Sequence, residues 1–200
     1  MPAPIEFYFD FSSPYGYLGS TRIDAIAARH GRETVWRPFL LGAVFKVTGG
    51  KPLPSLPLKG DYAVRDMARY ARLWGVPFRL PAKFPIATQA PARAFYWTDG
   101  RDAALAKRLS SALYDAYFNG NRDIGSPEVT ADVAAGLGLD RQEVLAAMED
   151  PEIKERLRHE NDAAVARGVF GSPFVIVDGE PFWGADRLDQ VERWLATGGW

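Results

Sequence analysis

The pattern of apolar and polar positions predicts two strands and a helix at the beginning of the chain. Residues 5–11 are rich in aromatic side chains and roughly alternating, as is typical of a β-strand. Apolar side chains at helical spacing then predict one helix over residues 14–30, which a glycine can close. Residues 34–37 are predicted to form a second strand. The order strand, helix, strand is that of a βαβ unit.

The middle of the chain, from Lys59 to Gly168, has an almost wholly helical pattern with repeated start and stop signals. The segment between the second strand and Lys59 is rich in glycine and proline, and it is predicted to be a loop. The predicted helices are residues 61–75, residues 101–118, residues 126–136, a helix that Asp140 and Glu143 begin as a capping box, and residues 150–168.

The end of the chain returns to a strand pattern. Residues 174–177 form a continuous apolar run, and an Asp-Gly pair then predicts a tight hairpin into residues 180–183. Because Pro181 has no N–H to donate, the second of these strands is predicted to lie at the edge of a sheet. Asp186 is predicted to cap a last helix that extends through Leu195.

This order of elements indicates an α/β, thioredoxin-like fold (βαβ…ββα) that is interrupted by an all-helical insertion. We assign residues 1–44 and 169–200 to the thioredoxin-like domain, and residues 45–168 to a linker loop and the helical insertion. The two halves of the domain are expected to combine into one sheet.

Composition excludes several classes of protein. Hydrophobic residues make up 47% of the 200 residues and charged residues 24%, values typical of a soluble globular protein. The net charge of -1 argues against nucleic acid or an anionic membrane as a partner. The sequence shows neither a secretory signal nor an apolar run that could span a bilayer, so we expect a cytoplasmic protein.

The chain contains no cysteine. Disulfides, thiolate zinc sites, cysteine nucleophiles and redox dithiols are therefore excluded, and no metal site is expected. Any sulfur chemistry must come from a bound ligand.

Ser13 is the first candidate for such chemistry. It precedes Pro14 where a strand leads into a helix, so unpaired N–H groups and the positive end of the helix dipole point at its hydroxyl. This position favours an anion. The alternative is that Ser13 does no more than cap its helix.

Two further elements are candidates for ligand binding. Pro173 follows Ser172 at the entrance to a strand and is a candidate cis proline, although an ordinary trans loop proline is the alternative. A cis bond would leave the backbone of Ser172 free to pair with an extended, peptide-like ligand. Asp186 either caps its helix or binds an ammonium group. If Ser13 and these elements converge, glutathione has a complement for each.

Other side chains have open assignments. Phe45, Tyr96, Trp97 and Trp183 either wall a pocket for a small aromatic substrate or belong to the core. Neither histidine is placed to act as a base for Ser13, so its hydroxyl is better suited to donate to a sulfur than to act as a nucleophile.

Four segments together resemble the 2-hydroxychromene-2-carboxylate isomerase family, which is related to kappa-class glutathione transferases and more distantly to DsbA-type oxidoreductases. The resemblance covers nearly the whole chain and implies a DsbA-like fold, bound glutathione and a homodimer. The segments are residues 9–18 (FDFSSPYGYL), 38–42 (PFLLG), 168–173 (GVFGSP) and 182–188 (FWGADRL).

The resemblance also implies roles for single residues. Ser13 matches the catalytic serine that hydrogen-bonds the glutathione sulfur, and Pro173 matches the cis proline. Ser172 matches the residue whose backbone pairs with the cysteinyl part of glutathione, while Asp186 matches the acid that holds the γ-glutamyl end. Lys59 resembles a lysine of the ligand-binding loop, with a solvated loop lysine as the alternative.

Two positions of the glutathione site depart from the family pattern. Gly50 stands where relatives often have asparagine, and Ala185, which we include among the glutathione-binding residues, stands where a small polar residue is common.

The reaction implied is the glutathione-dependent isomerisation of a chromene carboxylate to trans-o-hydroxybenzylidenepyruvate, a step of aromatic catabolism. Two alternatives remain open: a kappa-class-like transferase or peroxidase that attacks electrophiles and consumes glutathione, and a non-catalytic module that binds glutathione or a peptide.

Overall fold

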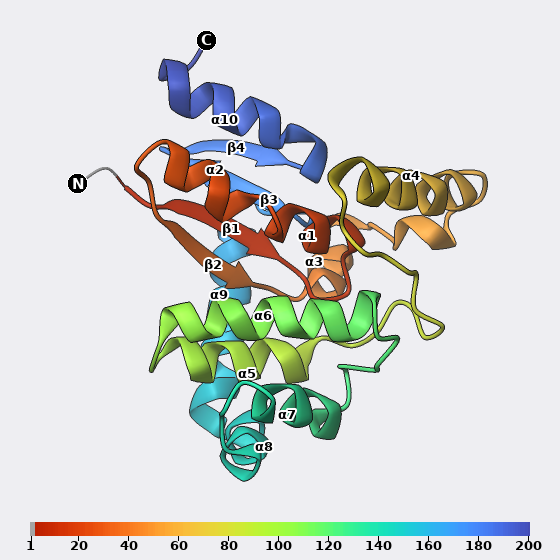
Figure 1. The fold of residues 1–200 in the computed structure, drawn as a ribbon, viewed down its shortest axis with the longest axis vertical. Helices are drawn as coiled ribbons and strands as arrows, with labels where there is room; N and C mark the ends of the chain where they lie inside the picture. The colour runs from red at the N-terminus through yellow and green to blue at the C-terminus, as the bar shows by residue number, and fades with distance from the viewer. Residues whose placement is uncertain (1–2) are drawn as a thin grey trace.

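The computed structural model describes residues 3–200, so Met1 and Pro2, with which the assigned thioredoxin-like domain begins, lie outside the described residues. Its strands form one mixed sheet in the order β2-β1-β3-β4 (Figure 1). The strands are β1 (Ile5–Phe9), β2 (Thr34–Pro38), β3 (Phe174–Val177) and β4 (Glu180–Trp183). β1 pairs in parallel with β2 and antiparallel with β3, which confirms that the two ends of the chain share a sheet.

The strands of the sheet follow the sequence prediction with one difference, the length of β1. β4 lies at an edge of the sheet and, among the described strands, pairs only with β3. No described strand lies on its other side, so the missing N–H of Pro181 leaves no acceptor there without a donor. The prediction that the first strand extends to residue 11 was wrong, because β1 ends at Phe9. Asp10 turns out of the sheet, and its backbone N–H bonds the hydroxyl of Ser172 instead of a neighbouring strand.

Helices make up most of the rest of the chain. The predicted caps of the insertion are confirmed, since Ser126, Asp140 and Asp150 each accept from an N–H of the helix that follows. The helices are α1 (Pro14–Ser20), α2 (Ile23–Arg29), α3 (Leu41–Thr48), α4 (Lys59–Trp74), α5 (Gln89–Asp99), α6 (Ala103–Phe118), α7 (Pro127–Ala135), α8 (Arg141–Glu149), α9 (Pro151–Ala166) and α10 (Leu188–Thr197), with 3-10 turns η1 (Leu53–Ser55) and η2 (Ala185–Arg187).

The single helix predicted over residues 14–30 is instead two helices, α1 and α2. The hydroxyl of Ser20 donates to the carbonyl of Tyr17, and the hydroxyl of Thr21 donates to the carbonyl of Leu18, both at 2.7 Å. Such bonds compete with the regular helical ladder, and they mark the point where the chain turns.

Two helices were missed. The region predicted as a loop before Lys59 contains α3 and η1, whose short helical signals are flanked by glycine and proline. α5 was overlooked because Pro91 normally argues against a helix. The proline lies in the first turn, however, where its missing N–H would have had no helical partner.

The two faces of the sheet carry different helices. Ile5, Phe7 and Phe9 of β1 belong to a large core with side chains of α2, α5 and α6, while Tyr8 on the opposite face packs in a smaller cluster with residues of α3 and α9. Leu188 and Val191 of α10 belong to the same large core. In Figure 1 α10 lies beside β4, whereas α5 and α6 lie on the β2 side of the sheet, and α7 and α8 lie farthest from α10.

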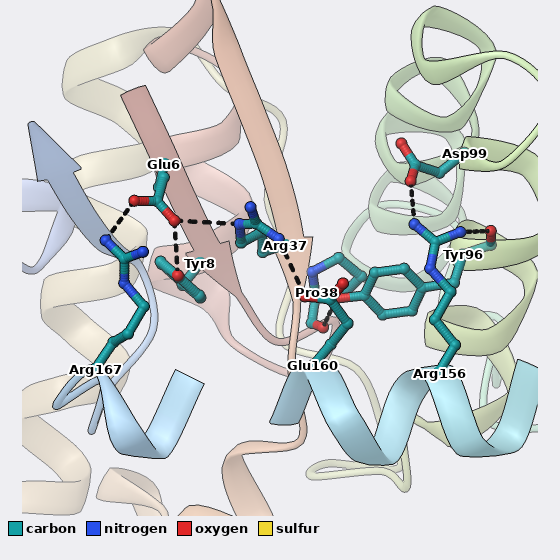
Figure 2. Close-up of polar contacts among 9 residues, drawn as sticks. All are labelled: Glu6, Tyr8, Arg37, Pro38, Tyr96, Asp99, Arg156, Glu160 and Arg167. Carbon is teal, nitrogen blue, oxygen red and sulfur yellow. Dashed lines mark hydrogen bonds and ion pairs between the residues drawn. The ribbon is translucent and has the colours of Figure 1, made fainter. Parts of the chain in front are cut away.

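A polar network fastens α9 to the sheet (Figure 2). The carboxylate of Glu6 accepts from Tyr8 at 2.9 Å and pairs with Arg167 at 2.5 Å and Arg37 at 3.2 Å, and Arg37 pairs with Glu160 of α9 at 3.1 Å. Burial, together with the bond to Glu6, raises the pKa of Tyr8 to about 12, so the phenol stays a donor. The insertion is therefore held to the strands at a fixed place.

Among residues 3–200 no helix combines the length and the apolar character that crossing a bilayer requires. The division of the chain at residues 44 and 168 stays a prediction.

Candidate functional site

A cavity of about 1160 Å³ opens beyond the end of β1, where α1, α3, α4, the loop before α5 and the turn after β4 meet. Ser13, Ser172, Ala185 and Asp186 line it, although they come from opposite ends of the sequence. A cavity of this size exceeds the usual range for one small ligand, so it has room for a tripeptide and a second molecule.

Ser13 is the N-cap of α1, as predicted, and its hydroxyl oxygen accepts from the N–H of Gly16 at 3.0 Å. The same hydroxyl donates to the carbonyl of Ser172 at 2.9 Å. Ser13 is 7% exposed and faces the cavity. Capping and a place in the site therefore hold together, and the capping bond contributes about 1 kcal/mol to the helix.

The Ser13 hydroxyl can change its acceptor. Its one proton is directed at a neutral carbonyl, and a sulfur anion beside it would compete for that proton. Hydrogen bonds to charged acceptors are roughly twice as strong as neutral ones, so the anion has the advantage. The site can thus stabilise a thiolate without moving its backbone.

The bond between Ser172 and Pro173 is cis, as the family resemblance implied. Ser172 has no sheet partner on its carbonyl, but the sequence did not anticipate that Ser13 occupies it. Within residues 3–200, no protein group accepts from the N–H of Ser172. This buried, unpaired donor fits the carbonyl of an extended peptide ligand such as glutathione.

Gly16 is a site residue that the sequence reasoning missed. A Cβ at this position would lie 2.7 Å from the Ser172 hydroxyl oxygen and 2.8 Å from that of Tyr114. In the spacing Ser13-x-x-Gly16, the glycine stands where a dithiol motif has its second cysteine. A side chain there would require the Ser172 and Tyr114 hydroxyls or α1 itself to shift.

Asp10 was also missed, because it appeared to belong to the first strand. It is 4% exposed and lines the cavity. Burial raises the pKa of its carboxyl, while hydrogen bonds from the N–H of Leu41, the N–H of Ser12 and the hydroxyl of Thr88 act in the opposite direction.

Asp186 does not cap the last helix, so that prediction was wrong. Gly184, at a φ of 112°, turns the chain into η2, and α10 begins only at Leu188. The Asp186 carboxylate instead pairs with Arg187 at 2.8 Å and stays 44% exposed at the cavity. It is therefore available to a ligand ammonium group, and the buried Ala185 fixes the turn behind it.

The lysines differ from the prediction. Lys59 is the first residue of α4, is exposed and does not line the cavity. Lys46 and Lys51 line it instead, together with Gly50. A role for Lys59 in ligand binding stays a prediction.

The four aromatic candidates divide evenly. Phe45 and Trp183 line the cavity, and Trp183 packs edge-on against Phe170 with ring centroids 4.9 Å apart. Tyr96 and Trp97 are core residues of α5, which confirms the core alternative for these two side chains.

Neither His30 nor His159 lines the cavity. In the part of the chain that the structure describes, no group of three or more His, Cys, Asp or Glu side chains could hold a metal ion. The site offers hydrogen-bond donation by Ser13 and Ser172 and charge pairing by Asp186, with Lys46 and Lys51 in the same lining.

Comparison with known proteins agrees with this geometry. The model of the DSBA-like thioredoxin domain matches residues 4–196. The chain is 31% identical to glutathione S-transferase kappa 2 of Caenorhabditis elegans, covering 96% of this chain and 91% of that protein. It is also 31% identical to a 2-hydroxychromene-2-carboxylate isomerase of Sphingobium xenophagum, covering 98% and 99%. A solved structure of a 2-hydroxychromene-2-carboxylate isomerase superposes with a TM-score of 0.88 at 28% identity, covering 97% of this chain and 95% of that one.

Proposed function

Because this chain belongs to the DsbA-like thioredoxin family, and within it resembles the chromene carboxylate isomerases and kappa-class transferases, we propose that it is a glutathione-dependent isomerase of a small aromatic substrate. One observation carries the proposal. The Ser13 hydroxyl lies at hydrogen-bond distance from Ser172, whose own N–H has no partner among residues 3–200, at the wall of a cavity large enough for two ligands.

In this proposal each part of glutathione has a partner. The N–H of Ser172 pairs with the backbone of the cysteinyl residue beside Pro173, and Asp186 binds the ammonium group of the γ-glutamyl end. Ala185 shapes the turn that presents Asp186, and Lys59, which lies outside the cavity lining, must move toward the ligand from the first turn of α4. The unpaired donor at Ser172 and the exposed carboxylate of Asp186 are the observations that support this orientation.

Ser13 has the central task of holding the sulfur as an anion. A hydrogen bond to a charged group contributes about 1.5 to 3 kcal/mol, and one pKa unit corresponds to about 1.4 kcal/mol. Ser13 and the N-terminus of α1 together therefore lower the pKa of a bound thiol by roughly one to two units from about 8.5. The thiol is then ionised near neutral pH.

When bound between Ser13, Ser172 and Asp186, glutathione would supply a thiolate nucleophile for reversible addition to the conjugated system of the ring-opened chromene. Ser13 stabilises the sulfur anion before addition and after expulsion. Phe45 and Trp183 offer apolar surface to an aromatic ring at the cavity wall. The expected product is trans-o-hydroxybenzylidenepyruvate, which places the protein in aromatic catabolism.

A transferase or peroxidase of the kappa class is the alternative, supported by the 31% identity to glutathione S-transferase kappa 2. It would use the same residues and consume glutathione. A module that only binds glutathione or a peptide would need Ser172 but no thiolate beside Ser13.

The test is an assay with 2-hydroxychromene-2-carboxylate, with and without glutathione, in which substrate, product and free thiol are followed together. The proposal predicts isomerisation that requires glutathione and leaves its concentration unchanged. Stoichiometric loss of the thiol would establish the transferase alternative, and no turnover with any electrophile would leave only the binding module.

We further propose a cytoplasmic homodimer that binds neither nucleic acid nor membrane. The cytosol holds the reduced glutathione pool that this chemistry requires. Val47, Leu58 and Tyr62, at 71%, 93% and 62% exposure, supply apolar surface that a second copy could cover. Light scattering should give twice the chain mass of 22.1 kDa, and a mass near 22.1 kDa at micromolar concentration would contradict the dimer.

A further inference from the structure

Asp10 binds three separate segments of the cavity wall through its side chain. One carboxylate oxygen, Oδ1, accepts from the N–H of Ser12 at 2.7 Å. The other, Oδ2, accepts from the N–H of Leu41 at 2.9 Å and from the hydroxyl of Thr88 at 3.0 Å. These donors belong to the turn before α1, the first residue of α3 and the residue that precedes α5.

The backbone of Asp10 joins the two halves of the proposed glutathione site. Its N–H donates to the Ser172 hydroxyl at 2.9 Å, and its carbonyl accepts from the N–H of Ser13 at 2.9 Å and from the hydroxyl of Tyr114 at 3.0 Å. Ser13 and Ser172 are therefore both bound to the same residue as well as to each other.

The burial of Asp10 carries a free-energy cost that a merely structural position does not require. A buried carboxylate costs free energy unless it is paired or hydrogen-bonded, and within residues 3–200 no lysine, arginine or histidine forms an ion pair with it. Its stability rests on three donors, each of which favours the ionised form. All three belong to segments that line the cavity, which points to a role in the site.

We propose that Asp10 is a positioning residue whose two carboxylate oxygens have separate tasks. Oδ1 shapes the turn that presents Ser13 to the sulfur. Oδ2 fixes the first turns of α3 and α5, which form the wall that carries Leu41, Phe45 and Thr88 and against which the second ligand lies. The inference rests on the proposed function for what the cavity binds, but the positions of the segments can be measured without any ligand.

Asp10→Ala removes both tasks. We expect the backbone amides of Ser12 and Leu41 to exchange their hydrogens about ten- to a hundredfold faster in the free variant, because each loses its hydrogen-bond acceptor. Turnover should fall at least tenfold, and KM for the aromatic substrate should rise.

Thr88→Val removes one donor to Oδ2 and keeps the shape of the side chain. We expect KM for the aromatic substrate to rise several-fold, while kcat and the dissociation constant for glutathione stay within about twofold of the wild type. This split between KM and kcat is the result that a general loss of stability would not give. The variant also keeps the inference testable if Asp10→Ala does not fold.

Thr130→Val is the matched control. Thr130 is fully buried in α7, its hydroxyl donates to the carbonyl of Ile124 at 2.7 Å, and neither residue lines the cavity. Thr130→Val loses a comparable hydrogen bond at another place. We expect hydrogen exchange at Ser12 and Leu41, as well as KM and kcat, to match the wild type.

Unchanged hydrogen exchange at Ser12 and Leu41 in Asp10→Ala would overturn the inference. So would kinetic constants in Thr88→Val that match those of Thr130→Val. A wild-type protein that fails to bind glutathione would instead refute the proposed function, and the exchange experiment would still decide the role of Asp10.

Discussion

Replacing Ser13 with alanine should lower the turnover of the glutathione-dependent reaction by about ten- to a hundredfold. The variant loses the donor that stabilises the thiolate, and a hydrogen bond to a charged group is worth about 1.5 to 3 kcal/mol, with tenfold in rate for each 1.4 kcal/mol. The affinity for glutathione should change little, because Ser172 and Asp186 still hold the peptide. Steady-state kinetics and calorimetric titration measure the two effects separately.

Ser126→Ala is the control for the loss of a helix cap. Ser126 also precedes a proline, also begins a helix and also accepts from the third N–H of that helix. Both variants should lose about 1 kcal/mol of stability, but only Ser13→Ala should lose turnover. Equal activity of Ser13→Ala and the wild type would remove Ser13 from the mechanism.

Replacing Gly16 with alanine should abolish most activity, with an expected loss of about a hundredfold. The new Cβ would come within 2.8 Å of the hydroxyl oxygens of Ser172 and Tyr114. Both oxygens are hydrogen-bonded to the backbone of Asp10, so making room for the Cβ either breaks these bonds or displaces α1. Each change disturbs the surroundings of Ser13, and a misplacement of about 1 Å at a reacting group can cost a hundredfold in rate. Overpacking should also cost about 1 to 3 kcal/mol of stability, measured by urea unfolding.

Gly42→Ala is the control for this substitution. Gly42 is helical and also lines the cavity, but a Cβ there would meet nothing within 4 Å. We expect unchanged or slightly higher stability, because alanine is the better helix former. Wild-type turnover in Gly16→Ala would show that the contact between α1 and the Ser172 turn is not required.

The sequence predicted those features of the site that depend on local rules. A serine before a proline at a strand end identifies an N-cap, so Ser13 could be found from its neighbours alone. The edge position of β4 followed from Pro181 in the same way. The order of the elements sufficed for the fold because a βαβ unit and a later hairpin have few ways to share one sheet.

The missed features depend on contacts between distant segments. Asp10 lies between two phenylalanines, so the alternation of apolar and polar residues resembled that of a strand. Nothing in the local sequence reveals that Leu41, Thr88 and Ser172 converge on it. Asp186 was assigned a capping bond because the sequence did not show that Gly184 would insert a 3-10 turn before the helix. In both cases tertiary contacts determine which partner a carboxylate finds.

The most direct test of the account is a pH titration of glutathione bound to the wild-type protein, followed by the ultraviolet absorbance of the thiolate. The chain has no cysteine, so any thiolate signal must come from the ligand. The thiolate role of Ser13 predicts that the bound thiol ionises roughly one to two pH units below a free thiol of pKa about 8.5, and that most of this shift disappears in Ser13→Ala. A bound thiol that titrates like the free one, or the same shift in both proteins, would contradict it.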